Sequence, residues 1–96
     1  MIELYYDGEV IDKWSNHQCS WNNQLVFINI EDGGERIKFL LTIGTLGTIN
    51  ELTHDCAETN QMENCIVKKD DVEHQVKAIL FNKGDTIILL LENKEK

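Results

Sequence analysis

The chain has 96 residues, contains no proline and carries 17 acidic against 9 basic side chains, a formal net charge of −8. This composition disfavours binding to nucleic acid and to anionic membranes, because both need clustered lysine and arginine. No run approaches the roughly 20 apolar residues of a membrane-spanning helix, and the N-terminal residues do not fit a signal peptide. We therefore expect one small cytoplasmic domain, residues 1–96, with one modest core.

The N-terminal residues predict a β-hairpin. Ile2–Tyr6 is rich in β-forming side chains, the Asp-Gly pair that follows is a strong two-residue turn signal, and residues 9–13 form the return strand. A two-residue loop places Glu3 opposite Asp12, and like charges that face each other weaken a hairpin. We therefore expect a short return strand, another register, or a cation or basic partner beside this pair.

Residues 14–23 break the strand pattern and predict a loop. The segment is polar except for Trp14, Cys19 and Trp21. We expect both tryptophans to fold back onto an open end of the sheet. The alternative is that they are exposed anchors for a partner, because tryptophan is enriched at interface hot spots.

A second hairpin is predicted between Leu25 and Ile43, with residues 31–34 as its turn. This turn places Ile28 opposite Ile37, and apolar side chains then alternate along both strands. The predicted core face carries Val26, Ile28, Ile30, Ile37, Phe39, Leu41 and Ile43.

A short helix is predicted at about residues 49–58. The preceding segment, Gly44–Gly47, suits a loop or a bulged corner. Thr48 and Glu51 then fit a capping box, with Thr48 as the N-cap. One face of the helix would carry Ile49, Leu52 and Cys56.

The rest of the chain is organised around a third hairpin, residues 76–92. Its second arm holds five consecutive aliphatic residues, Ile87–Leu91, which predict a strand buried on both faces, and residues 82–84 suit the bend. A short strand, Cys65–Lys69, and an Asp-Asp turn precede the hairpin. The predicted inner face of its first arm carries Val72, His74, Val76, Ala78 and Leu80.

These elements predict an all-β fold of about seven strands. Short turns between sequential strands favour a mainly antiparallel meander that closes as a small barrel or sandwich, with one short helix near 49–58. The alternative is an α+β fold, in which that helix packs on one sheet.

Two His-x-Cys pairs raise the question of a metal site. Residues two apart in an extended segment point the same way, so His17 with Cys19 and His54 with Cys56 could together hold zinc. The spacing matches no recognised zinc signature, and we expect neither a metal nor another cofactor. A zinc-stabilised or small-ligand-binding β domain is the alternative that these pairs would support.

The sequence contains no residue pattern typical of a catalytic site, and we expect a protein that is not an enzyme. No phosphate-binding glycine loop is present, and the paired carboxylates lie in polar turns that would not raise a pKa for acid–base work. Acidic surroundings raise the pKa of a thiol and so oppose cysteine nucleophiles. A disulfide between Cys56 and Cys65 would be opposed by a reducing cytosol.

The distribution of charge carries the functional expectation. Seven acids and two lysines lie between Glu51 and Glu73, and four acids with no base lie between Glu3 and Asp12. If the two stretches share a face, they form a negative patch that attracts a basic protein. The alternative is a solvated acidic rim that serves solubility alone.

We therefore expect a small acidic binding protein that inhibits a basic partner. The specific hypothesis is an immunity protein or antitoxin that neutralises a nuclease toxin by occluding its basic active-site cleft. The alternative is a phage-encoded inhibitor that mimics DNA against a host defence nuclease. The residues expected to bind the partner are Asp55, Glu58, Glu63, Asp70, Asp71, Glu73, Trp14 and Trp21.

Overall fold

The computed structural model describes residues 1–15, 23–31, 33–82 and 85–94, within which lie seven strands, one α-helix and one short 3-10 helix. The strands are β1 (Ile2–Tyr6), β2 (Glu9–Trp14), β3 (Gln24–Asn29), β4 (Glu35–Leu40), β5 (Cys65–Lys69), β6 (Val72–Asn82) and β7 (Thr86–Asn93). The helix α1 (Ile43–Thr59) follows β4 in the chain, and the 3-10 helix (Met62–Asn64) leads into β5.

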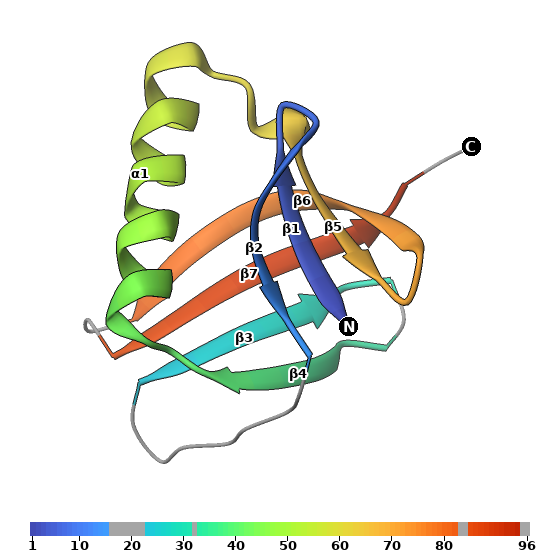
Figure 1. Cartoon of the computed structure of the whole chain (residues 1–96). Helices are drawn as coiled ribbons and strands as arrows, with labels where there is room; N and C mark the ends of the chain where they lie inside the picture. The colour runs from blue at the N-terminus through green and yellow to red at the C-terminus, as the bar shows by residue number, and fades with distance from the viewer. Residues whose placement is uncertain (16–22, 32, 83–84, 95–96) are drawn as a thin grey trace.

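The seven strands form one sheet with the order β2-β1-β5-β6-β7-β3-β4. Each pair of neighbours is antiparallel except β3 and β7, which run parallel. The sheet curls into a half-barrel, and α1 lies along one side of the curl (Figure 1). The predicted all-β fold with one helix is confirmed, although the parallel pair means that the strands do not form a simple meander.

The core lies on the inner face of the curled sheet, and β7 is an interior strand of that sheet. This strand pairs with β6 on one side and with β3 on the other. Ile87, Leu89 and Leu91 are buried, as predicted for one face of β7. The other face, with Ile88 and Leu90, is only half-buried, so the strand is not buried equally on both faces as predicted. Two residues of the predicted bend, 83 and 84, lie outside the described residues. The main core cluster comprises Ile2, Leu4, Leu25, Phe27, Ile37, Phe39, Leu41, Ile49, Leu52, Cys56, Cys65, Val67, Val76, Ile87, Leu89 and Leu91.

The first hairpin forms as predicted but in another register. Its turn residue Asp7 has a φ of 53° and the following glycine a φ of 85°, the conformation of a tight hairpin turn. A bulge between Leu4 and Tyr5 shifts the pairing, so that Glu3 faces Lys13 rather than Asp12. The expected like-charge pair is thereby replaced by a pair of opposite charges.

The predicted register of the second hairpin is wrong by one residue. Five residues, 30–34, separate β3 from β4, one more than predicted, and Phe27 faces Ile37. A slip of one residue turns every side chain of a strand to the other face. The inner face of β3 is therefore Leu25, Phe27 and Asn29, and the core assignments of Ile28 and Ile30 are wrong. Val26 is buried as predicted, but it lies on the other face of β3 and outside the main core cluster. The predictions for Ile37, Phe39 and Leu41 in and after β4 are confirmed.

The helix begins earlier than predicted. Thr42 is its N-cap, and the Thr42 hydroxyl oxygen accepts a hydrogen bond from the Thr45 N–H at 3.1 Å. Thr48 lies inside the helix, so the predicted capping box and the predicted loop at Gly44–Gly47 are both wrong, and Ile43 is exposed rather than in the core. The burial of Ile49, Leu52 and Cys56 along one face is confirmed, and this packing offsets the cost of two helical glycines, about 1 kcal/mol each.

The inward face of β6 changes along its length. His74 and Val76 are buried as predicted, but a bulge follows Val76 and shifts the alternation. Beyond the bulge, Ile79 packs against the core, and Leu80 is 46% exposed. Val72, at the start of the strand, is 56% exposed, so neither it nor Leu80 is buried in the core as predicted.

We expect Thr42→Ala to lower the free energy of unfolding by about 1 kcal/mol, because it removes the acceptor that caps α1. Thr48→Ala is the matched control. The Thr48 hydroxyl only donates to the Gly44 carbonyl oxygen within the helix, and its loss should cost less than about 0.5 kcal/mol. Urea denaturation followed by circular dichroism measures both, and a larger loss for Thr48→Ala would move the helix start back to the predicted position.

Candidate functional site

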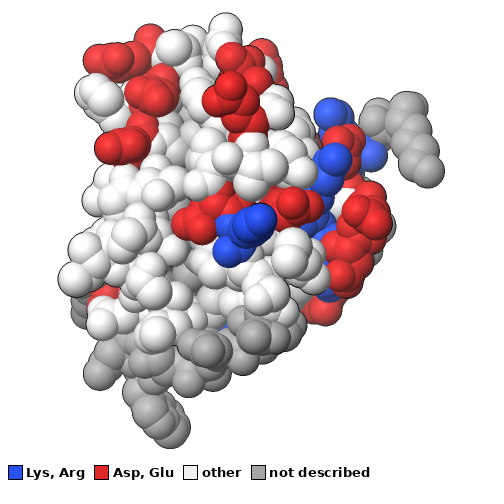
Figure 2. Space-filling model, in the orientation of Figure 1, with Lys and Arg blue, Asp and Glu red and all other residues white. Residues whose placement is uncertain are grey.

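One end of the molecule gathers carboxylates from three segments. The segments are the β1–β2 turn, the C-terminal half of α1 and the 3-10 helix, and none of them contains lysine or arginine. The backbone N–H of Asp7 donates to the Asn64 carbonyl oxygen at 3.1 Å, which joins the turn to the 3-10 helix. Figure 2 shows the acidic side chains over the upper part of the molecule. We call this surface the acidic end, and its residues are Asp7, Glu9, Glu51, Asp55, Glu58 and Glu63.

A shallow groove of about 270 Å³ runs between α1 and the first hairpin at the acidic end. Tyr6, Ile11 and Leu52 supply its apolar lining, while Glu51 and Asp55 line it from the helix. The Thr45 hydroxyl donates to an Asp12 carboxylate oxygen at 3.2 Å and so fixes the start of α1 against β2. The two walls of the groove are therefore held together by the fold itself.

The acids of α1 lie toward the C-terminal end of the helix, where positive charge is favourable. The C-terminal end of a helix carries partial negative charge, and cations near it stabilise the helix. The last turn of α1 contains no basic residue. His54 Nε2 lies 3.3 Å from a Glu58 carboxylate oxygen on the exposed surface. These carboxylates therefore cost local stability, which is a common property of residues kept for binding.

Of the remaining predicted acids, Asp70 and Asp71 lie elsewhere, whereas Glu73 lines a shallow hollow with Asp7, Glu63 and Lys68. Asp70 and Asp71 form the β5–β6 turn, at the opposite end of the β1–β5 pair from the acidic end. The N-terminal ammonium of Met1 lies 3.1 Å from an Asp70 carboxylate oxygen, and Lys94 Nζ lies 3.7 Å from a Glu73 carboxylate oxygen. The structure thus brings Asp55, Glu58 and Glu63 to one end, together with Asp7 and Glu9 of the first hairpin, but does not unite all six predicted acids in one patch.

Trp14 folds back onto the core, as expected. Its ring lies 5.3 Å from the Phe27 ring and 6.0 Å from the Phe39 ring, measured between ring centroids. The side chain is half-buried, so it supports the end of the curled sheet and exposes only part of its surface. Trp21 lies outside the described residues, and its role stays a prediction.

The expected geometry of the second His-x-Cys pair is wrong. His54 and Cys56 lie in α1, where residues two apart point to different sides, rather than in an extended segment. His54 is exposed, and Cys56 is buried in the core. His17 and Cys19 lie outside the described residues. Within the described part of the chain, no three His, Cys, Asp or Glu side chains are grouped to hold a metal ion.

The fold brings two cysteines together inside the core. The Sγ atoms of Cys56 and Cys65 lie 3.2 Å apart, and both thiols are free. Burial raises the pKa of the Cys65 thiol far above its ordinary value, and the hydrogen bond and charge interaction with Cys56 raise it further. Cys65 therefore stays protonated in the folded chain and is a poor nucleophile.

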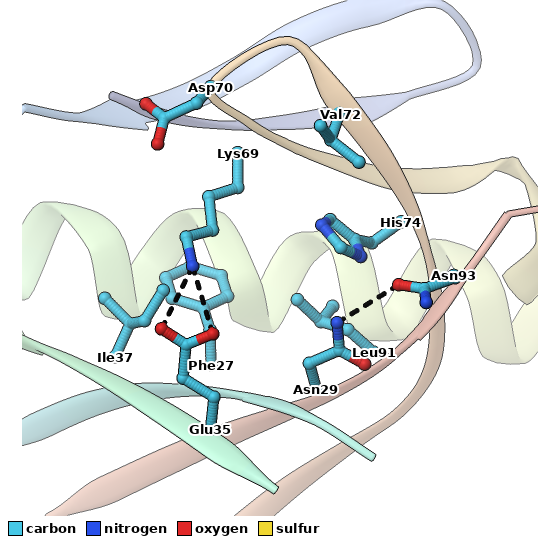
Figure 3. A pocket seen from close by; sticks show the side chains of 10 residues that line it. All are labelled: Phe27, Asn29, Glu35, Ile37, Lys69, Asp70, Val72, His74, Leu91 and Asn93. Carbon is cyan, nitrogen blue, oxygen red and sulfur yellow. Dashed lines mark hydrogen bonds and ion pairs between the residues drawn. The ribbon is translucent and has the colours of Figure 1, made fainter. Parts of the chain in front are cut away.

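A cavity of about 350 Å³ opens where the β5–β6 turn approaches the ends of β3 and β4 (Figure 3). Its lining comes from five strands or their turns, and it was not predicted from the sequence. Asn29 was not predicted to point inward, because the predicted register of β3 was wrong by one residue. His74 was predicted as an inward residue of its strand, but not as part of a cavity. The apolar lining residues are Phe27, Ile37, Val72 and Leu91.

Comparison of the chain with protein-family models, with curated proteins and with solved structures finds no match. In the described part of the chain, no helix is long and apolar enough to cross a membrane.

We expect the free energy of unfolding to fall as pH rises above about 8.5, the ordinary pKa of a thiol. Above this pH the unfolded chain loses the Cys65 proton, whereas the folded chain keeps it, so unfolding releases a proton. One such thiol contributes a slope that approaches about 1.4 kcal/mol per pH unit. Urea denaturation between pH 7 and 10 measures this slope.

Cys65→Ala is the control for this pH dependence. All other titratable groups are the same in both proteins, so the difference between the two slopes isolates the Cys65 thiol. The variant should depend less steeply on pH, whatever its stability at pH 7. Equal slopes would mean that Cys65 ionises as readily in the folded chain as in the unfolded chain.

Proposed function

We propose that this chain is a small cytoplasmic binding protein that inhibits a basic protein partner through its acidic end. The proposed partner is a nuclease toxin, which makes the chain an immunity protein or antitoxin rather than an enzyme. The observation that carries the proposal is the acidic end itself. Exposed carboxylates of the first hairpin, of α1 and of the 3-10 helix gather there, and two of them, Glu51 and Asp55, line a groove.

The groove of the acidic end suits a lysine or arginine side chain from a partner. The aliphatic part of such a side chain would pack on Tyr6, Ile11 and Leu52. Its charged head would then reach the carboxylate of Glu51 or Asp55, and hydrogen bonds between charged groups are about twice as strong as neutral ones. A single basic residue of the partner could therefore be both buried and paired.

A nuclease cleft is the kind of surface that the acidic end complements. Such a cleft binds the phosphates of nucleic acid with lysine and arginine. The acidic end presents exposed carboxylates on a helix and two tight connections, so their positions are set by the fold. The net charge of −8 adds a long-range attraction that speeds association with a basic protein.

The experiment captures the partner and tests the interface together. The tagged chain is purified at low salt from cells of its own source, and the complex is identified by native mass spectrometry. A basic protein whose nuclease activity falls when the purified chain is added supports the proposal. Glu51→Gln combined with Asp55→Asn should slow association with that protein by about fivefold or more at low salt, and should weaken its salt dependence.

Asp70→Asn combined with Asp71→Asn is the matched control. It removes the same charge at the opposite end of the β1–β5 pair, and asparagine tolerates the positive φ values of 50° and 67° at these positions. Association should stay within about twofold of the unmodified chain. If this variant slows association and the variant of Glu51 and Asp55 does not, the interface is not the acidic end. A partner that is neither basic nor a nuclease contradicts the proposed function.

A further inference from the structure

We propose that Cys56 and Cys65 are a site of reversible covalent modification: they form a disulfide when the chain folds in the presence of a small disulfide oxidant such as oxidised glutathione. The bond joins the last turn of α1 to the first residue of β5. Both residues are buried and neither belongs to the acidic end, so this inference does not rest on the proposed function.

The two sulfur atoms already lie close to bonding distance. Their separation is 3.2 Å, and a disulfide bond is about 2.05 Å long, so closure needs a movement of about 1 Å. Cys56 is held by the end of α1, where the Asn60 N–H donates to the Cys56 carbonyl oxygen at 2.7 Å. Cys65 is held by its pairing with Tyr6 between β5 and β1. The folded backbone therefore brings the two thiols together before any bond forms.

The reaction is an exchange between thiols and a disulfide. The thiolate of one cysteine attacks a sulfur atom of oxidised glutathione, which gives a mixed disulfide and releases one glutathione. The second cysteine then attacks the protein sulfur of that mixed disulfide, forms the Cys56–Cys65 bond and releases the second glutathione. The two cysteines lose two protons and two electrons, and the oxidised glutathione gains them as it becomes two thiols.

Burial decides when this exchange takes place. Cys65 is 0% exposed and Cys56 is 4% exposed, so glutathione does not reach either sulfur atom in the folded chain. Burial also raises the pKa of the Cys65 thiol, which opposes formation of the attacking thiolate. The exchange therefore needs an unfolded or locally open chain. Once the chain has folded it keeps the state in which it folded, because the buried bond is equally inaccessible to a reductant.

The bond joins the two walls of the groove at the acidic end. Asp55, which lines the groove from α1, precedes Cys56, and Tyr6, which lines it from the first hairpin, pairs with Cys65. The start of α1 is already tied to β2 by a side-chain hydrogen bond, and the disulfide ties its other end to the sheet. The cross-linked residues are nine positions apart, and closing such a loop restricts the unfolded chain and so stabilises the folded one.

The experiment refolds the chain from urea with an excess of oxidised glutathione or with reduced glutathione alone. A Cys19→Ser background leaves Cys56 and Cys65 as the only cysteines. After oxidising refolding, the intact mass should be about 2 Da lower than that of the reduced chain, and peptide mapping should find the Cys56–Cys65 bond. The melting temperature should rise by at least about 5 °C. Absence of the bond, or a melting temperature that does not rise, overturns the proposal.

The effect of burial on timing is measured on the folded chain. Oxidised glutathione added to the folded, reduced chain should form the bond at least about tenfold more slowly than during refolding. Reduced glutathione should likewise cleave the bond at least about tenfold more slowly in the folded chain than in urea. Equal rates in the two states would overturn the inference that folding fixes the redox state.

Cys56→Ala combined with Ala57→Cys, in the same background, is the matched control. It exchanges two neighbouring residues of α1, so the composition is unchanged, but the thiol moves from a buried position to an exposed one. Oxidising refolding should leave the melting temperature of this variant within about 2 °C of its value under reducing conditions. An equal rise in the control would overturn the role assigned to Cys56. If the control does not fold, the mass and melting temperature of the chain that keeps Cys56 still decide the proposal.

Discussion

The parallel pairing of β3 with β7 is the constraint on which the rest of the structure depends. A parallel pair needs a long connection between its strands, and here that connection is β4, α1, β5 and β6. It places β7 between β6 and β3, so that the most apolar strand is an interior strand of the sheet. The same pairing sets Asn29 beside Leu91, and Asn29 and Asn93 then line one wall of the cavity. The curl, the core and the cavity all follow from this one contact.

The acidic end and the cavity lined by His74 lie at opposite ends of the short β1–β5 pair. At one end, negative charge is concentrated on a helix terminus that would be more stable with positive charge there. At the other end, Lys69 is paired with Glu35 and Asp70 with the N-terminal ammonium, and His74 Nδ1 is buried with no hydrogen-bond partner among the described residues. Both ends give up local stability, one through charge and the other through desolvation. A tightly packed core with Leu4, Val67 and Leu89 fully buried between them supplies that stability.

Patterns among neighbouring residues predicted most strands of this fold. They could not predict the features that depend on contacts between residues far apart in the sequence. The first turn and the strand Cys65–Lys69 are encoded by neighbouring residues, and both were predicted correctly. The inner face of β3 was predicted wrongly because the turn after it is one residue longer than expected. The start of α1 was predicted wrongly because tertiary packing overrides the low helix propensity of two glycines. The cavity joins Asn29 to Asn93, which are 64 positions apart, so no local pattern could reveal it. The segments of the acidic end were predictable as acidic, but not as neighbours.

The half-barrel has two edge strands, and their sequences help to explain how the protein avoids aggregation. β2 and β4 are the outermost strands of the sheet, and an exposed edge is a template for pairing with another chain. The bulge at Ile11 of β2 interrupts the regular pairing of this edge strand with β1, and charged residues lie along β4 (Glu35, Arg36 and Lys38). Repulsion between copies of a chain with a pI near 4.7 adds to this protection at neutral pH. Acidification toward that pI removes the repulsion and leaves the edge residues as the remaining barrier to self-association.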